Sequence, residues 1–156
     1  MSTKPGKIYL IVHNVRSLFN VGAFFRTADV FGVEKIYLCG YTGTPPRNQI
    51  SKVALGAEET VAWEKKVQTT TLIKNLKKKG VQVIALETGD KNRVVALPKF
   101  KPKFPVALVV GHEVDGLPEN ILKLCDEIVE IPMIGQKESL NVSVAAGIGL
   151  YALRNC

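Results

Sequence analysis

Short apolar runs alternate with amphipathic segments along most of the chain. Each run is four to six residues long and is nearly continuous, which is typical of strands that are covered on both faces of a parallel sheet. The segments between the first runs have helical periodicity. We therefore predict a single α/β domain with a mostly parallel sheet and helices on both faces. The predicted strands are Ile8–Val12, Lys35–Cys39, Val81–Leu86, Val106–Val110 and Ile128–Ile131.

Three helices are predicted from apolar spacing and from residues that start or stop helices. The first begins at Asn20 or a neighbour and ends before Gly32, and the second covers 69–79. The last begins at about Asn141 or Val142 and ends near residue 153. This last helix has almost no polar side, so we expect it to be buried all round, either by a partner subunit or by its own subunit.

Composition narrows the class of protein. The chain has 156 residues, which fits one domain over 1–156 without a separate RNA-binding domain. Its net charge of +7 suits an anionic partner, and nucleic acid is the first candidate. The three cysteines lack Cys-x-x-Cys spacing and indicate free thiols in a reducing cytoplasm. We expect no signal peptide, and no apolar run reaches the ~20 residues of a membrane span.

Several common site types are excluded. No Gly-x-Gly-x-x-Gly follows the first predicted strand, and there is no phosphate-binding loop of the Gly-x-x-x-x-Gly-Lys type. With only His13 and His112, a histidine-rich metal cluster is excluded, and we expect no metal. No residue stands at a recognisable spacing from His112 to orient its imidazole ring as a base, so a structural role is favoured for it.

Three polar segments follow or adjoin strand ends instead. They are Asn20–Arg26 (NVGAFFR), Gly111–Pro118 (GHEVDGLP) and Ile131–Ala145 (IPMIGQKESLNVSVA). Ligands of open parallel sheets bind beyond the carboxyl ends of the strands, so these segments are candidates for the walls of a ligand site. Taken in this order, the three resemble the motifs of the SpoU family of RNA ribose 2′-O-methyltransferases, which belong to the SPOUT superfamily. The resemblance covers nearly the whole chain.

The resemblance implies a catalytic set and a fold feature. The catalytic residues would be Arg26, Asn20, Glu113, Ser139 and Asn141. The family assigns activation of the ribose hydroxyl to the arginine, but a guanidinium keeps its proton and is a poor base. Arg26 would instead hold a phosphate and position the hydroxyl, with Glu113 fixing the guanidinium and shaping its loop. The family fold also implies a deep trefoil knot in the C-terminal half.

The structural alternatives for these residues are simple. Arg26 is otherwise a solvated helix arginine, and Glu113 a loop carboxylate. Ser139 and Asn141 are otherwise caps of the last helix, a role that is compatible with ligand binding through the backbone.

The cofactor implied by the resemblance is S-adenosylmethionine, held largely by backbone groups of three loops. Two apolar side chains would sandwich the adenine, and a glycine would allow close approach of the backbone. The corresponding residues here are Leu86, Thr88, Gly89, Gly111, Ile131, Met133, Ser139 and Leu140.

The expected partner is tRNA or rRNA, contacted by Arg16, Arg26, Arg47 and Lys52. A homodimer is also expected, with Arg26 of one chain near the third motif of the other. Two other functions remain open from the sequence: a base-methylating enzyme of the same superfamily, and a knotted RNA-binding module without catalysis.

Overall fold

The computed structural model describes residues 4–89 and 92–156; residues 1–3, part of the polar start of the chain, and 90–91 lie outside the description. A seven-stranded sheet runs through this part of the chain in the order β3-β2-β1-β6-β4-β7-β5, and every pairing in it is parallel. The predicted α/β class and parallel sheet are confirmed. The strands are β1 (Ile8–His13), β2 (Lys35–Cys39), β3 (Trp63–Lys66), β4 (Gln82–Leu86), β5 (Val94–Ala96), β6 (Val106–Val110) and β7 (Glu127–Glu130).

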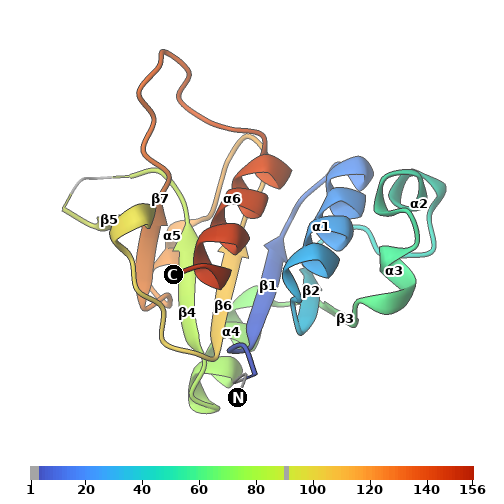
Figure 1. Cartoon of the computed structure of the whole chain (residues 1–156), viewed down its shortest axis with the longest axis horizontal. Helices are drawn as coiled ribbons and strands as arrows, with labels where there is room; N and C mark the ends of the chain where they lie inside the picture. Colours follow the sequence, from blue (N-terminus) through green and yellow to red (C-terminus); the bar gives the residue numbers. More distant parts are fainter. Residues whose placement is uncertain (1–3, 90–91) are drawn as a thin grey trace.

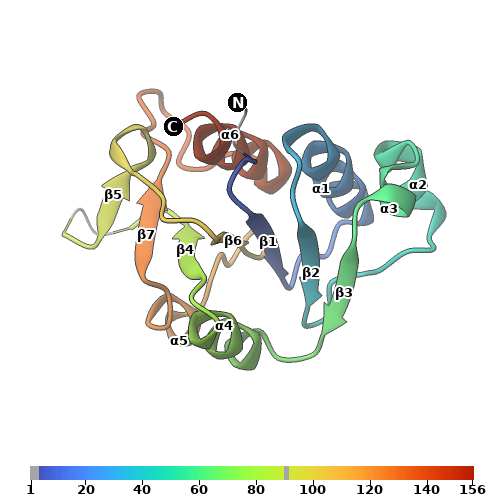
Figure 2. The same ribbon diagram turned by 60° about the horizontal axis from the view of Figure 1, so that its bottom comes forward.

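Helices cover both faces of the sheet (Figures 1 and 2). The α1 and α6 helices lie side by side on one face, and α4 and α5 lie on the other. Each face has its own group of buried apolar side chains. The helical elements are α1 (Leu18–Phe31), α2 (Asn48–Ala54), α3 (Ala57–Thr60), α4 (Thr69–Lys78), the 3₁₀ turn η1 (Leu97–Lys99), α5 (Glu119–Leu122) and α6 (Val142–Arg154).

The centre of the sheet is the pairing of β1 with β6. Ile8 pairs with Val106 and Val12 with Val110, so the two strands run in register over five residues. All five residues of β6 are buried, as the continuous apolar run predicts for a strand covered on both faces. The residues that follow β1 and β6 therefore leave the sheet next to each other.

Some local expectations need correction. The α1 helix begins at Leu18, and its cap is Ser17, whose Oγ accepts the backbone N–H of Asn20 at 3.2 Å. The sequence predictions also missed α2, α3, α5, η1, β3 and β5. These elements have three to seven residues and too few apolar positions for a readable period; β3, for example, is Trp-Glu-Lys-Lys.

The expectation that α6 is buried on all sides is wrong within one subunit. Its inner face packs on β4 and β6, where Gly149 lets the helix approach Leu108 and Leu86. On its outer face Val144, Ile148 and Tyr151 are 50%, 39% and 58% exposed. The helix therefore leaves an apolar surface beside α1.

Arg154 anchors the end of α6. Its guanidinium donates to the carbonyl oxygens of Phe31 at 2.9 Å, Gly32 at 3.1 Å and Gly6 at 2.7 Å. Carbonyls at the end of α1 lack helical partners, so a cation there satisfies them. In the described part of the chain, no helix is long and apolar enough to cross a membrane.

We predict that Gly22→Ala destabilises the fold, although alanine is the better helix former. A Cβ at this buried position would collide with the backbone carbonyl of Ile50, which cannot rotate away. We expect a loss of about 1–3 kcal/mol in the free energy of unfolding, measured by denaturant titration. Gly135→Ala, where a Cβ meets no atom within 4 Å, is the control and should change stability little. Equal stability of Gly22→Ala and wild type would contradict this packing.

Candidate active site

A cavity of about 320 Å³ opens at the carboxyl edge of the sheet. Its walls come from the residues after β4, from the loop after β6 and from the long connection between β7 and α6. Figure 1 shows that connection extending beyond the sheet before the chain turns back into α6. Parallel sheets bind ligands at this edge, so the cavity is the candidate ligand site.

The residues predicted to bind the cofactor gather here. The lining includes Leu86 and Thr88 from the first wall, Gly111 from the second, and Ile131, Met133, Ser139 and Leu140 from the third. Gly89 is the exception: it lies outside the lining, and its backbone N–H donates to Glu130 Oε2 at 3.3 Å. The structure thus brings together residues that are about 20 to 54 positions apart in the sequence.

The loop after β6 has a tightly folded shape. Gly111 is buried, and a Cβ on it would lie 2.7 Å from Leu117 Cδ2 and 2.9 Å from the backbone of Gly116. His112 Nδ1 accepts the backbone N–H groups of Val114 at 3.0 Å and Asp115 at 2.9 Å. These bonds give His112 the structural role favoured from the sequence.

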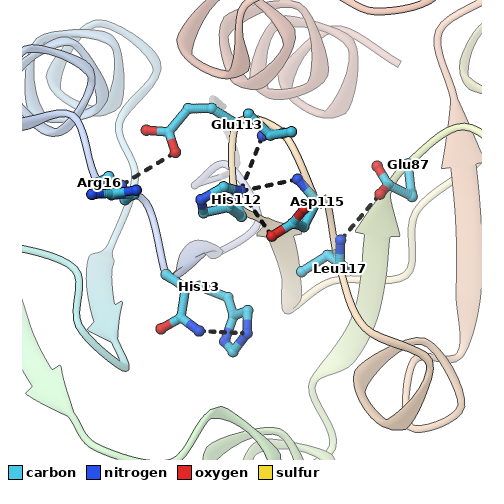
Figure 3. Close-up of polar contacts among 9 residues, drawn as sticks. His13, Arg16, Glu87, His112, Glu113, Asp115 and Leu117 are labelled. Atoms are coloured by element: carbon cyan, nitrogen blue, oxygen red, sulfur yellow. Dashed lines mark hydrogen bonds and ion pairs between the residues drawn. The ribbon is translucent and has the colours of Figure 1, made fainter.

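Glu113 connects this loop to the start of α1. Its carboxylate accepts the backbone N–H groups of Arg16 at 3.2 Å and Ser17 at 3.0 Å, and the side-chain amide of Asn20 at 3.4 Å. Figure 3 shows the Glu113 side chain pointing toward Arg16. Burial disfavours the ionised carboxylate, but the hydrogen bonds outweigh burial and hold the pKa of Glu113 below its usual range.

Asn20 extends the connection to the third motif. Its Oδ1 accepts the side-chain amide of Asn141 at 3.5 Å. Asn141 in turn is the cap of α6, because its Oδ1 accepts the N–H groups of Ser143 at 2.9 Å and Val144 at 3.4 Å. A polar chain of two side-chain hydrogen bonds therefore links one residue from each motif within one subunit: Glu113, Asn20 and Asn141.

Arg26 does not join this chain. It lies on α1, its side chain is exposed, and among residues 4–89 and 92–156 it has no hydrogen-bond or ion-pair partner. The expectation that Glu113 fixes the guanidinium is therefore not met, because the carboxylate holds the start of α1 instead. Its neighbours Phe24 and Phe25 are buried, which turns Arg26 away from the core.

The other basic candidates are exposed as well. Arg16 precedes α1 and lies next to Glu113, whereas Arg47 is the N-cap residue of α2 and Lys52 lies in its last turn. Of these three residues, only Arg16 has a hydrogen bond to a residue that lines the cavity, from its backbone N–H to Glu113.

Sequence reasoning missed Glu87, which also lines the cavity. The residue directly follows β4, and its Oε1 accepts the backbone N–H of Leu117 at 3.1 Å (Figure 3). Burial raises the pKa of this carboxyl group, and the N–H groups of Leu117 and Thr88 partly offset that effect. Its place between two predicted cofactor residues, Leu86 and Thr88, was the available signal. Across the described ranges, no group of three or more His, Cys, Asp or Glu side chains is arranged to hold a metal ion.

The geometry agrees with what comparisons with known proteins find. The model of the SpoU rRNA methylase family matches residues 7–151. This chain belongs to the SpoU rRNA methylase family. The family match therefore confirms the resemblance carried by the three motifs.

Relatives are known by sequence and by structure. The 23S rRNA (guanosine-2′-O-)-methyltransferase RlmB of Vibrio vulnificus is 33% identical over 92% of this chain and 57% of its own length. An rRNA methyltransferase of Sinorhizobium meliloti, solved with bound AdoMet, has a TM-score of 0.87 and 28% identity over 97% of this chain and 57% of that one. A TrmH/SpoU tRNA modifying enzyme from A. aeolicus has a TM-score of 0.85 and 30% identity, with 96% and 74% covered. This chain spans just over half the length of the first two.

We predict that Glu113→Gln weakens folding in a pH-dependent way. Because the pKa of Glu113 is lowered on folding, its carboxylate stabilises the protein at neutral pH, and this contribution is lost as pH falls through the folded-state pKa, below 4.5. The variant should lose roughly 0.5–1.5 kcal/mol at pH 7 and approach wild type in acid.

Denaturant titrations at several pH values measure this difference. Glu138→Gln, which changes an exposed carboxylate of the long connection, serves as the matched control. A stability difference that stays constant down to pH 3 would contradict the assigned role of the Glu113 carboxylate.

Proposed function

We propose that this protein transfers a methyl group from S-adenosylmethionine to a ribose 2′-hydroxyl of tRNA or rRNA. The observation that carries the proposal is the cavity, whose lining contains all the residues implied to bind the cofactor except Gly89. The relatives named for guanosine 2′-O-methylation and the AdoMet-bound structural neighbour support the same reaction. The RlmB relatives favour ribose over base as the target.

The residues of the cavity fit the cofactor by their chemistry. Ile131 and Leu140 offer apolar surface on one wall, and Gly111 lets backbone approach a ligand closely. When bound, the cofactor supplies an activated methyl group on a sulfonium. The protein has to place the ribose oxygen in line with that methyl group, so positioning carries most of the catalysis.

Arg26 is proposed to perform that positioning. An exposed guanidinium that has no partner among the residues the structure describes is available to hold an RNA phosphate with two hydrogen bonds. Asn20, Glu113, Ser139 and Asn141 complete the proposed catalytic set, in which the first two and Asn141 fix the relative positions of the three motifs. Arg16, Arg47 and Lys52 are proposed to contact other RNA phosphates.

A homodimer is part of the proposal. The exposed apolar residues of α6 border a groove of about 500 Å³ against α1, which includes Phe31 and Tyr151. A two-fold interface over this groove would cover the apolar side of α6 and bring Arg26, on the adjacent part of α1, toward the partner's cavity.

Three further features belong to the same proposal. The chain over 1–156 acts as one methyltransferase domain. Its C-terminal half forms the trefoil knot of the SPOUT superfamily, which is supported by family membership and by the return of α6 onto β4 and β6. The RNA substrate and the free cysteines support a cytoplasmic location.

Leu140→Asp is predicted to abolish binding of S-adenosylmethionine, because it places a charge against the apolar wall of the cavity. Calorimetry in the presence of a chelator measures binding. Ile134→Asp is the matched control: it makes the same change in the same connection, at a side chain that is fully exposed and outside the lining. If Leu140→Asp bound the cofactor as wild type does, the cofactor site would be wrong.

Arg26→Ala is predicted to remove methyl transfer while cofactor affinity stays within a few fold, because Arg26 does not line the cavity. Arg26→Lys should also fail, since an ammonium cannot make the two-pronged phosphate contact. Single-turnover methylation of RNA is the measurement. Lys74→Ala, at an exposed position of α4 on the other face of the sheet, should keep full activity.

Mixing subunits tests the shared site. Arg26→Ala and Leu140→Asp subunits should each be inactive alone. Their mixed dimer should regain one working site, with Arg26 from one subunit and the cavity from the other. No recovery, despite formation of the mixed dimer, would show that each site is built from one chain.

A further inference from the structure

The charge of the cavity differs from that of the whole protein. The chain carries a net charge of +7, yet the described residues that line the cavity include the carboxylates Glu87, Glu113 and Asp115 and no lysine or arginine. Among the described residues, no group of three or more His, Cys, Asp or Glu side chains is arranged to hold a metal ion. The negative charge of the walls acts on any ligand that enters the cavity.

Two of the three carboxylates, Glu113 and Asp115, differ from Glu87 in their partners or in their exposure to water. Glu113 is directed to the start of α1, where its oxygens accept the N–H groups of Arg16 and Ser17. Asp115 has a side chain that is 84% exposed, so water screens its charge. Glu87 is the carboxylate that is half-buried in the cavity wall.

The position of Glu87 is fixed by the two loops that it joins. Its Oε1 accepts the N–H of Leu117, and a Cβ on Gly116 would collide with the same oxygen. Gly116 has a φ of +67°, a conformation that favours glycine, so the loop is shaped to receive this carboxylate. The charge is thus held at a set place in the wall and does not move away when a ligand binds.

We propose that Glu87 makes the cavity prefer the methyl donor over the demethylated product. The inference rests on the proposed cofactor. S-adenosylmethionine and S-adenosylhomocysteine share adenine, ribose and the amino-acid group, but only the donor carries the positive sulfonium. A fixed carboxylate in a partly desolvated wall attracts that charge, and in a cavity of this size the ligand lies within roughly one Debye length of it.

The preference has a consequence for turnover. Methyl transfer converts the cationic ligand into one with no net charge, and the attraction to Glu87 falls at that moment. The product therefore lacks the attraction that helps to retain the donor, so fresh donor can replace it at the site. Glu87 is thus a specificity-determining residue of the cofactor site.

Calorimetry of both ligands at pH 8 tests the proposal. Glu87→Gln should weaken binding of S-adenosylmethionine and leave S-adenosylhomocysteine nearly unchanged, so that the ratio of the two Kd values changes by about threefold to tenfold. Asp115→Asn, which neutralises the exposed carboxylate of the same cavity, should change the ratio less than about twofold. Equal weakening of both ligands would overturn the proposal, because it would mean that Glu87 binds a shared group or only shapes the loop.

Wild type provides a second test that needs no variant. Raising the salt concentration should reduce its preference for the donor, since salt screens charge but not the shared contacts. A preference that is independent of salt would count against Glu87. If wild type bound neither ligand, the proposed function itself would fail, and that result is distinct from the others.

Discussion

The parallel pairing of β1 with β6 is the constraint on which the site depends. It joins strands that are about 100 residues apart and makes both end at the same edge of the sheet. Residues 13–20 consequently leave the sheet beside residues 111–117, where the carboxylate of Glu113 satisfies backbone N–H groups ahead of α1. Without this register, the first and second motifs would not meet.

The polar chain from Glu113 through Asn20 to Asn141 then fixes the third motif. Its bonds of 3.4 and 3.5 Å are long, but each end also has a structural role, since Glu113 holds the start of α1 and Asn141 caps α6. Helix starts and site residues are therefore the same residues. Because the same residues begin the helices and line or border the site, they hold the cavity wall in place although the 132–141 connection is exposed.

The sequence allowed prediction of the elements whose apolar pattern is strong. The strands Lys35–Cys39 and Val106–Val110 were predicted to the residue, because each has a nearly continuous apolar run and is bounded by glutamate or proline before it and by glycine after it. The β3 strand was missed because it lies at the edge of the sheet and its last three side chains are charged, which leaves no apolar run. The start of α1 was predicted at Asn20 or a neighbour, whereas the helix begins at Leu18 with Ser17 as its cap. Serine and asparagine are equally good caps, and only the structure shows that the Asn20 side chain contacts Glu113 instead.

The motifs predicted the site residues that they contain, but they did not indicate the role of other side chains that line the cavity. Glu87 was passed over because motif-based reasoning assigned this loop to backbone contacts, and its carboxylate gains meaning only when Leu117 and Gly116 are seen next to it. The exposed side of α6 was also hidden, because a helix that is apolar all round does not reveal which of its faces another element covers.

The central claim is that the protein methylates ribose in RNA. Mapping 2′-O-methylated nucleotides in total RNA from cells with and without this protein tests it most directly. We expect loss of ribose methylation at a defined tRNA or rRNA position when the protein is absent, and its return when the wild-type protein is restored. Unchanged ribose methylation, or loss of a methylated base instead, would contradict the account.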